Sequence, residues 1–152
     1  MRYWLMKSEP DMFGIEDLKK RPKQTEPWDG VRNYQARNMM RDDMAVGDKA
    51  FFYHSNCAEP GIVGIMTIAK AGYPDTTALD PESQYYDPKA SSDNPRWYRV
   101  DVKFEKQFDK TIGLTRLKQY PQLEGMTVLT KGSRLSITPV SNAHWDFIQS
   151  LI

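Results

Sequence analysis

Cysteine and histidine are scarce in this chain. Its 152 residues include one cysteine, Cys57, so no disulfide can form within the chain, and a reducing compartment is expected. The two histidines and that single thiol form no ligand pair at a zinc-binding spacing. The sequence therefore predicts neither a disulfide framework nor a metal site.

Excess charge and long apolar runs are missing as well. The formal net charge is +1, so the overall basic footprint typical of nucleic-acid-binding proteins is absent, and any phosphate contact must come from a local patch. No apolar run approaches membrane-spanning length, and the N-terminal residues lack the apolar core of a signal peptide. We therefore expect no membrane contact, and a cytoplasmic protein, or a nuclear one in a eukaryotic source.

The short motifs of several enzyme classes are also absent. There is no glycine-rich phosphate loop, no dinucleotide fingerprint, and no nucleophile elbow around Ser55. Two nucleophilic arrangements stay open, Cys57 with His54, and Ser55 with His54 and Glu9. Neither has a recognised signature, so the sequence identifies no catalytic residue and no cofactor.

The apolar pattern predicts a single α+β domain over residues 1–152, built on a small, partly closed barrel. Strands are expected at residues 2–6, 51–54, 61–69, 96–105 and 133–140. Short helices are expected at residues 15–20, 34–44 and 114–120 and after residue 141. Strand 2–6 is apolar on both faces, which indicates a central position in the sheet.

Two of these helices have a cap and an inward stripe. Asn33 and Ser141 are placed to cap their first turns. The positions expected to face the core are Ala36, Met40 and Met44 in the first helix and Trp145, Ile148 and Ile152 in the second.

A long excursion separates two of the strands. Residues 72–95 hold four prolines among many Asp, Ser and Thr residues, which predicts a loop far longer than a structural connection needs. Such a loop is typically functional or mobile. One hypothesis is therefore a partner-binding domain with the excursion as its interface, which would require an exposed apolar patch there.

Polar groups stand at the ends of three of the predicted strands, in the stretches LMKSEP, FFYHSN and KGSRLS. The side chains concerned are Lys7, Ser8 and Glu9, then His54, Ser55 and Asn56, then Lys131, Ser133 and Arg134. Between the first two stretches lies WDGVRNYQARN, with aromatic, amide and arginine side chains. If the strand ends meet at one mouth, this inventory suits a flat base held by stacking, hydrogen-bonded at its edge and flanked by phosphate.

Each aromatic or basic candidate also has a structural interpretation. Trp28 could simply fasten its loop to the core, and Arg37 and Arg41 could form a solvated helix face. Trp4 and Trp145 are expected in the core. Trp97 lies at the start of its strand, out of phase with the apolar face, so a core position is less natural for it.

The chain resembles the EVE-domain family in motifs spread from Arg2 to about Leu151. The matching stretches are YWLMKSEPDMFGIEDL, WDGVRNYQARN, GDKAFFYHSN, PGIVGIMTIA, GYPD, NPRW and KGSRLSITPVS, of which GYPD and NPRW depart slightly from the commonest forms. The resemblance implies a PUA-like fold, with a strongly curved, partly closed sheet of five or six strands and short helices around it. It also implies kinship with YTH domains, which hold a methylated adenine in an aromatic cage.

The resemblance further implies a reader of DNA or RNA that carries a modified base. The ligand-binding residues it indicates are Lys7, Ser8, Trp28, Asn33, Tyr53, Ser55 and Asn56, with Trp97 and Arg134 at the rim. The expected phosphate contacts are Arg32, Arg37, Arg41 and Lys131. A small enzyme acting on a nucleobase or nucleoside in the same pocket remains the alternative.

Overall fold

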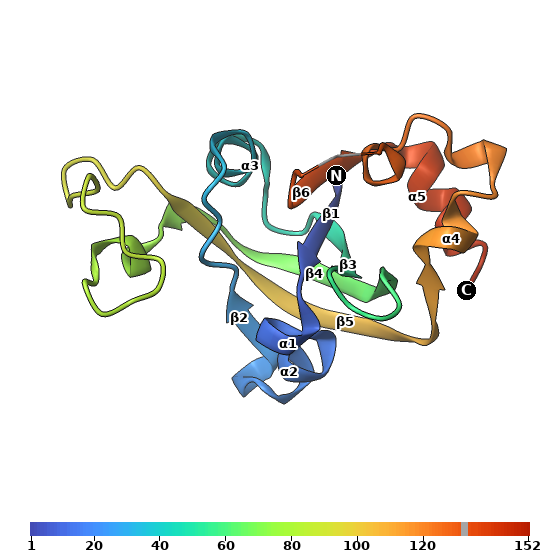
Figure 1. Ribbon diagram of the computed structural model, residues 1–152, viewed down its shortest axis with the longest axis horizontal. Coiled ribbons are helices and arrows are strands. Elements are labelled where there is room, and N and C mark those ends of the chain that lie inside the picture. The colour runs from blue at the N-terminus through green and yellow to red at the C-terminus, as the bar shows by residue number, and fades with distance from the viewer. Residues whose placement is uncertain (132–133) are drawn as a thin grey trace.

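The computed structural model describes residues 1–131 and 134–152, and the chain folds around one six-stranded mixed sheet (Figure 1). The strands are β1 (Tyr3–Ser8), β2 (Thr25–Pro27), β3 (Lys49–His54), β4 (Gly61–Pro74), β5 (Tyr98–Gly113) and β6 (Ile137–Val140). Their order across the sheet is β2-β5-β4-β3-β1-β6. The predicted α+β class is confirmed.

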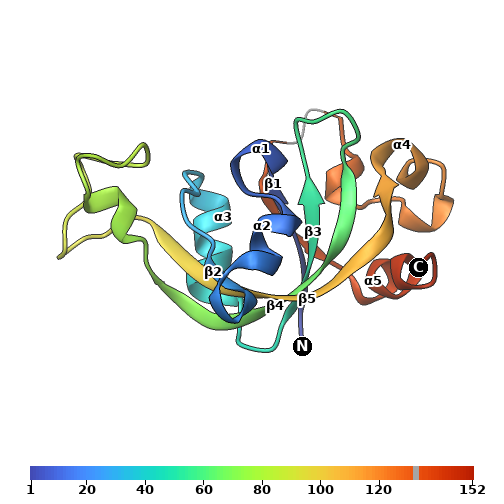
Figure 2. The ribbon, with the colours of Figure 1, turned by 90° about the horizontal axis from the view of Figure 1, so that it is seen from below.

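The sheet is strongly curved but open. β1 runs parallel to β3, whereas the other neighbouring strands are antiparallel. Four register shifts between β4 and β5 bend this long pair, whose sweep is seen in Figure 2. In the described part of the chain, β2 and β6 form the two edges and do not pair with each other, so the expected partial closure goes no further than curvature.

Each face of the sheet carries its own hydrophobic core. Neighbouring residues alternate between them: Phe52 on β3 packs in one cluster and Phe51 in the other. On β1, Trp4 and Leu5 divide in the same way, and all four side chains are buried. This confirms that β1 is a central strand.

Short helices cover both faces. They are α1 (Pro10–Phe13), α2 (Ile15–Lys20), α3 (Tyr34–Asn38), the π-helix η2 (Met39–Asp43), α4 (Leu114–Leu117) and α5 (Asn142–Gln149). Single 3₁₀ turns lie at η1 (Pro22–Gln24), η3 (Thr76–Leu79), η4 (Pro121–Leu123) and η5 (Thr127–Leu129). Figure 1 shows α1 and α2 near one edge of the sheet and α4 and α5 at its far end. No helix in the described ranges is long and apolar enough to cross a membrane.

The predicted inward stripes are largely confirmed. Ala36, Met40 and Met44 are buried, although the helix changes from α to π at Met39. Trp145 and Ile148 are buried in the second core, but Ile152 is 46% exposed. The prediction for Ile152 is wrong because α5 ends at Gln149.

Strand lengths differ more from the expectation. β4 reaches Pro74 and β5 reaches Gly113, because each is the other's partner along nearly its whole length. β2 forms in a segment for which the sequence predicted no strand, since residues 25–27 pair with the edge of β5. The last strand begins at Ile137 rather than at residue 133.

The excursion forms a closed loop at one end of the β4–β5 pair. The Asp75 N–H donates to the Trp97 carbonyl oxygen over 2.9 Å, which joins the two ends of the loop. In Figure 1 the loop projects at the left of the molecule, beyond α3. Its base therefore lies beside the segment that leads from β2 to α3.

Candidate functional site

A cavity of about 680 Å³ opens where the end of β1 meets the β2–α3 connection and the excursion. Its lining comes from residues 7–9, 12–13, 21, 26–32, 84–85 and 136. Four segments distant in sequence thus build one site. Lys7, Ser8, Trp28 and Arg32 of the predicted site residues lie in this lining.

The inner wall is aromatic. Trp28 is only 6% exposed, and its ring meets that of Phe52 edge-on at 5.4 Å between centroids. Phe13 packs edge-on against the same indole at 6.3 Å. The Trp28 backbone N–H donates to the Val100 carbonyl oxygen, which fixes the loop on β5. Trp28 therefore belongs both to the core and to the cavity wall, and its contact with a ligand stays a prediction.

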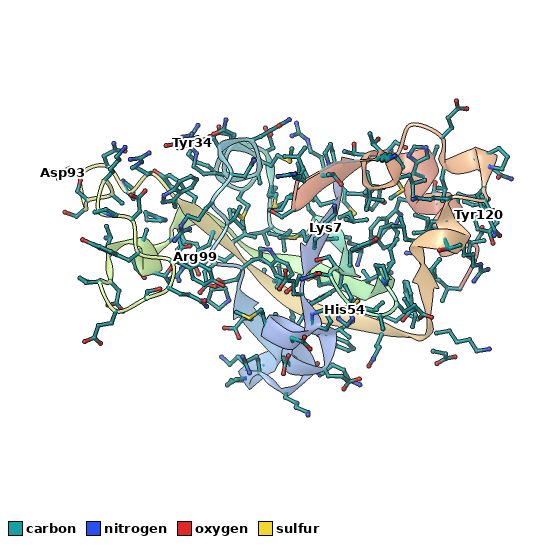
Figure 3. The ribbon with its side chains drawn as sticks, in the orientation of Figure 1. Lys7, Tyr34, His54, Asp93, Arg99 and Tyr120 are labelled. Carbon is teal, nitrogen blue, oxygen red and sulfur yellow. The ribbon has the colours of Figure 1, made fainter. Side chains whose placement is uncertain are left out.

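Lys7 and Ser8 provide polar groups at the end of β1 (Figure 3 labels Lys7). Burial lowers the pKa of the Lys7 ammonium from its ordinary value. The Ser8 hydroxyl donates to the Phe13 carbonyl oxygen over 2.6 Å. With its proton so engaged, Ser8 can only accept a hydrogen bond from a ligand, whereas Lys7 can only donate.

The outer wall is held by Arg32. Its Nε and Nη2 donate to the Tyr85 carbonyl oxygen, its Nη1 to Asp75 and to the Val31 carbonyl oxygen, and its Nη2 also to Thr77. These bonds engage all five N–H groups of the guanidinium. A phosphate could reach Arg32 only by replacing one of them.

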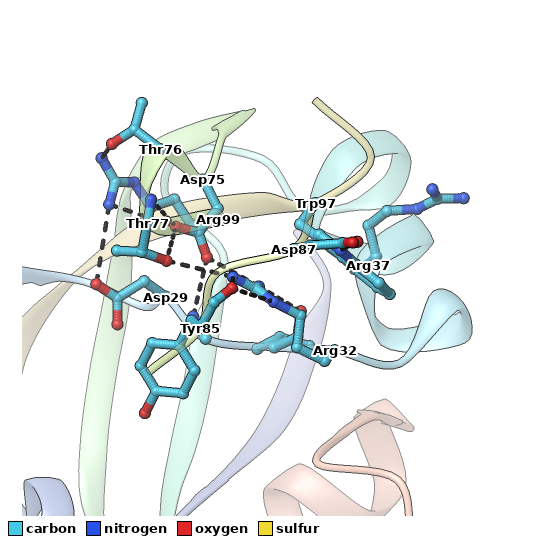
Figure 4. Close-up of polar contacts among 12 residues, drawn as sticks. Asp29, Arg32, Arg37, Asp75, Thr76, Thr77, Tyr85, Asp87, Trp97 and Arg99 are labelled. Carbon is cyan, nitrogen blue, oxygen red and sulfur yellow. Dashed lines mark hydrogen bonds and ion pairs between the residues drawn. The ribbon is translucent and has the colours of Figure 1, made fainter. Parts of the chain in front are cut away.

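Asp75 is the centre of the polar network behind that wall (Figure 4). The residue is fully buried, and its carboxylate accepts hydrogen bonds from the Gly30 N–H at 2.9 Å and from both the N–H and the hydroxyl of Thr77. Arg32 and Arg99 lie within ion-pair distance. Burial acts to raise the pKa of Asp75, but the hydrogen bonds from Thr77, Gly30 and Arg32 outweigh it, and the pKa is lowered.

Carboxylates also line the cavity itself. Burial, with the charge of Asp75 next in size, raises the pKa of the Asp29 carboxyl, while Arg99 opposes the shift. Glu26 is paired with Arg21. The cavity therefore presents acceptors as well as cations, as a ligand with both donors and acceptors on its edge requires.

The polar end of FFYHSN lies just behind the cavity wall. The Ser55 N–H donates to the Ser8 carbonyl oxygen over 3.0 Å, and Asn56 Nδ2 donates to Glu9 Oε1 over 3.2 Å. Tyr53 packs in the core on the opposite face of the sheet, with Lys7 Nζ 5.9 Å from its ring centroid. None of the three is in the lining, and each contacts a residue that is.

His54 is outside the cavity lining and contacts the start of α2 (Figure 3 labels His54). Its Nε2 accepts a hydrogen bond from the Ile15 N–H over 3.1 Å. Burial lowers the pKa of the imidazole, with a smaller opposing effect of Asp17. Of the candidate triad only Glu9 lines the cavity, so His54 and Ser55 form no relay with it toward a ligand.

The remaining candidates lie around α3. Asn33 caps α3 by accepting from the Ala36 N–H over 3.0 Å. Trp97 is buried outside both core clusters, beneath the excursion, and its Nε1 donates to Asp87 over 2.7 Å. Arg41 pairs with Asp42, whereas Arg37 lies on α3 next to the excursion (Figure 4).

Lys131 and Arg134 are exposed residues on either side of residues 132–133 and do not line the cavity. Ser133 lies outside the described residues. The sequence analysis missed Phe13, Asp75 and Tyr85. Only Asp75 had a local signal, because an Asp two residues before a Thr can form a tight side-chain turn.

The excursion offers little apolar surface. Within residues 72–95, all of which the structure describes, Tyr86, at 42% exposure, is the single exposed large apolar side chain. This does not make the contiguous patch that the partner-binding hypothesis required. In the described ranges, no three His, Cys, Asp or Glu side chains gather closely enough to hold a metal ion.

The curved mixed sheet, with an aromatic and polar cavity at its strand ends, defines an α+β domain with one candidate ligand site. Over residues 2–151 the chain matches the EVE domain, and it belongs to that family. The family expected from the motifs is thus confirmed.

Several relatives share the whole fold. Thymocyte nuclear protein 1 of Homo sapiens is 48% identical over 98% of this chain and 73% of its own. A crystal structure of a Pseudomonas putida protein is 52% identical, with a TM-score of 0.94 and 98% of each chain covered. The crystal structure of human THYN1 protein in complex with 5-methylcytosine containing DNA is 48% identical, with a TM-score of 0.94 over 99% of this chain and 97% of that one.

Proposed function

We propose that this domain binds DNA carrying a modified cytosine and holds the modified base in the cavity. The observation that carries the proposal is its likeness to human THYN1 protein, 48% identical with a TM-score of 0.94, whose crystal structure is a complex with 5-methylcytosine containing DNA. Identity at this level over nearly the whole chain supports a shared ligand class as well as a shared fold.

The cavity has a suitable size and lining for a base. Its volume of about 680 Å³ lies within the range of ligand pockets, roughly 300–1,000 Å³. A base inside a duplex cannot reach such a cavity, so binding requires a flipped or unpaired nucleotide. The Trp28 and Phe13 rings supply apolar surface against which a methyl group gains dispersion energy.

The polar groups match the edge of cytosine. Its exocyclic amine is a donor that carboxylates recognise, and Ser8 can accept from it too. Lys7 can donate to the ring carbonyl oxygen. The carboxylate of Glu9, Glu26 or Asp29 would accept a hydrogen bond from the amine, depending on the orientation of the ring in the cavity.

The same similarity suggests where the domain works. The curated relatives include thymocyte nuclear proteins. A domain that reads DNA would act beside the genome, in the nucleus of a eukaryotic cell or in the cytoplasm of a cell without one.

A titration with short oligonucleotides tests the proposal. The panel contains one DNA sequence with cytosine, 5-methylcytosine or 5-hydroxymethylcytosine at a single position, and the RNA counterpart of each. Tryptophan fluorescence is the signal. We expect the tightest binding to DNA with a modified cytosine. Equal affinity for every member would overturn the proposal, and preference for a modified RNA would replace DNA by RNA.

A Lys7→Met variant tests the cavity as the binding site. The substitution keeps most of the side-chain volume and removes the ammonium donor, so we expect affinity to fall about tenfold or more, because hydrogen bonds to charged groups contribute about 1.5–3 kcal/mol. Lys110→Met, on the exposed surface of β5, removes the same charge outside the lining. Equal losses in the two variants would place the base elsewhere.

A further inference from the structure

A column of rings and guanidinium groups leads from the cavity wall to the surface beside α3. Arg32 lines the cavity, and its Cζ lies 5.3 Å from the centroid of the Trp97 ring. Trp97 in turn stacks on Tyr34, with centroids 4.8 Å apart and planes 19° from parallel. Because Tyr34 is 48% exposed, the column reaches solvent two contacts beyond the cavity wall.

Two arginines meet at the outer end of this column. The Arg37 Cζ lies 4.7 Å from the Tyr34 ring centroid, and the Arg96 guanidinium lies 5.9 Å from it and donates to the Tyr34 hydroxyl. Arg37 Nη1 also donates to the Arg96 carbonyl oxygen over 2.8 Å. Tyr34 therefore holds both guanidinium groups at one place on the surface.

The charge at this place is only partly compensated. Within the portion of the chain that the structure describes, no carboxylate lies within ion-pair distance of Arg37, whose hydrogen bonds go to neutral oxygens of Arg96 and Asn38. Arg96 approaches Asp87 at 3.7 Å. In a chain whose net charge is only +1, Arg37 and Arg96 together form a local basic patch.

The backbone at Arg96 is unusual in a way that serves this arrangement. Its φ of +63° lies in the left-handed region, which costs a residue with a side chain free energy. Through this turn the Arg96 carbonyl oxygen faces Arg37 while its side chain reaches Tyr34. The neighbouring Trp97, fixed by Asp87, keeps the turn in place.

We infer that Arg37 and Arg96 bind a backbone phosphate of the DNA strand beside the nucleotide whose base occupies the cavity. The identity of the strand rests on the proposed function, whereas the site itself lies outside the cavity lining. Guanidinium groups suit phosphate oxygens in geometry and charge. Tyr34 is a positioning residue, because it acts by holding the two arginines.

The salt dependence of binding separates this phosphate contact from a merely solvated helix face. Each phosphate neutralised by a cation contributes about 0.7–0.9 to the slope of log K against log salt concentration. An oligonucleotide with a single 5-methylcytosine is titrated against the parent and Arg37→Gln at several salt concentrations. We expect the variant to lose a slope of about 0.7–0.9, and about five- to eightfold in affinity at 0.1 M salt.

Arg116→Gln is the matched control. Arg116 also lies over a tyrosine ring, with its Cζ 5.9 Å from the Tyr120 centroid and its Nε donating to the Tyr120 hydroxyl over 3.0 Å. Figure 3 shows Tyr34 and Tyr120 at widely separated places on the molecule. The control removes the same charge from the same kind of pair, and we expect its slope to equal that of the parent.

A phosphate-free ligand completes the test. The nucleoside 5-methyl-2′-deoxycytidine should bind Arg37→Gln and the parent equally, and Tyr34→Phe should keep more of the oligonucleotide slope than Tyr34→Ala. A parent slope in Arg37→Gln, with its melting temperature unchanged, would overturn the inference and leave the base site intact. Failure of the parent to bind any modified oligonucleotide would overturn both.

Discussion

At the scale of single residues, Asp75 joins the β2–α3 connection to the excursion. Its carboxylate accepts from Gly30 and Arg32 on one side and from Thr77 on the other, and it has no exposed surface. A buried charge of this kind is stable only while its partners remain in place. Its loss should therefore affect the fold and the cavity together.

We expect Asp75→Asn to lower the free energy of unfolding by roughly 3 kcal/mol, because the substitution leaves the Arg32 and Arg99 charges without their buried counter-charge. Urea denaturation measures the loss. Asp93→Asn, on the exposed part of the excursion, provides the control. An Asp75→Asn curve that coincides with that of Asp93→Asn would show that the network contributes no net stability.

His54 makes stability depend on pH. The folded state lowers its pKa from 6.5, so the unfolded chain takes up a proton first as the pH falls. The free energy of unfolding should therefore decrease as the pH drops below about 6.5, until the folded imidazole is protonated as well. Protonation also removes the acceptor for the Ile15 N–H.

Chemical denaturation between pH 7.5 and 5 measures this dependence. In His54→Gln, whose amide oxygen can accept the same bond without titrating, the decrease over that window should be smaller than in the parent. His144→Gln, in α5, should retain the full decrease. Parallel curves for the parent and His54→Gln would remove His54 as the cause.

The local sequence pattern was enough to locate the strand β3 and the polar segment that follows it. The buried strand and the polar residues His54, Ser55 and Asn56 at its end were recognised, and this polar end lies behind the cavity wall rather than in its lining. Which groups face the ligand could not be read from the pattern, because Ser55 and Asn56 contact Ser8 and Glu9 through pairings distant in sequence. Their roles at the ligand remain a prediction.

At the scale of elements, the β2–α3 connection and the excursion fit together at Gly30. Its φ is +76°, and a Cβ there would lie 2.5 Å from Cζ of the Tyr85 ring. The Tyr85 ring therefore packs directly against the backbone of Gly30, where a side chain would leave no room for it. This contact, with the Arg32 bonds, places the outer wall of the cavity.

We expect Gly30→Ala to displace Tyr85 and weaken oligonucleotide binding several-fold, in addition to a backbone strain of about 1–2 kcal/mol. Gly125→Ala is matched to it, since Gly125 has φ +86° and open space around its Cα. That variant should show the strain without the binding loss, by thermal unfolding and by titration. Unaltered binding by Gly30→Ala would mean that Tyr85 does not shape the ligand site.

Element types were easier to predict than element lengths. Periodicity identified the helices that carry Ala36 and Trp145, because each buries one face against a core. It could not show that β4 and β5 continue to Pro74 and Gly113, since each extension forms by pairing with the start of the other strand, Tyr73 with Arg99 and Ile112 with Ile62. The three residues of β2 form for the same reason.

At the scale of the whole molecule, the sheet separates two cores with different tasks. One contains Trp28 and Phe52 and supports the cavity, whereas the other lies beneath α5 and contains Ile148. The two faces share strands but not side chains. Stability and ligand affinity should therefore respond differently to changes on the two faces.

Ile148→Val should lower the free energy of unfolding by about 1 kcal/mol and leave the affinity of the folded protein unchanged. Phe52→Leu removes the ring on which Trp28 rests, so it should lower both quantities. Denaturation and titration on the same samples give the comparison. A loss of affinity in Ile148→Val equal to that in Phe52→Leu would contradict the separation.

The excursion leaves and re-enters the sheet at almost the same point, because the Asp75 N–H is bonded to the Trp97 carbonyl oxygen. A segment whose two ends are joined in this way can change its sequence or length while the strands on either side keep their pairing. It nevertheless contributes Gln84 and Tyr85 to the cavity. Exchange of this one segment could thus change ligand preference while the sheet and its strand pairing stay unaltered.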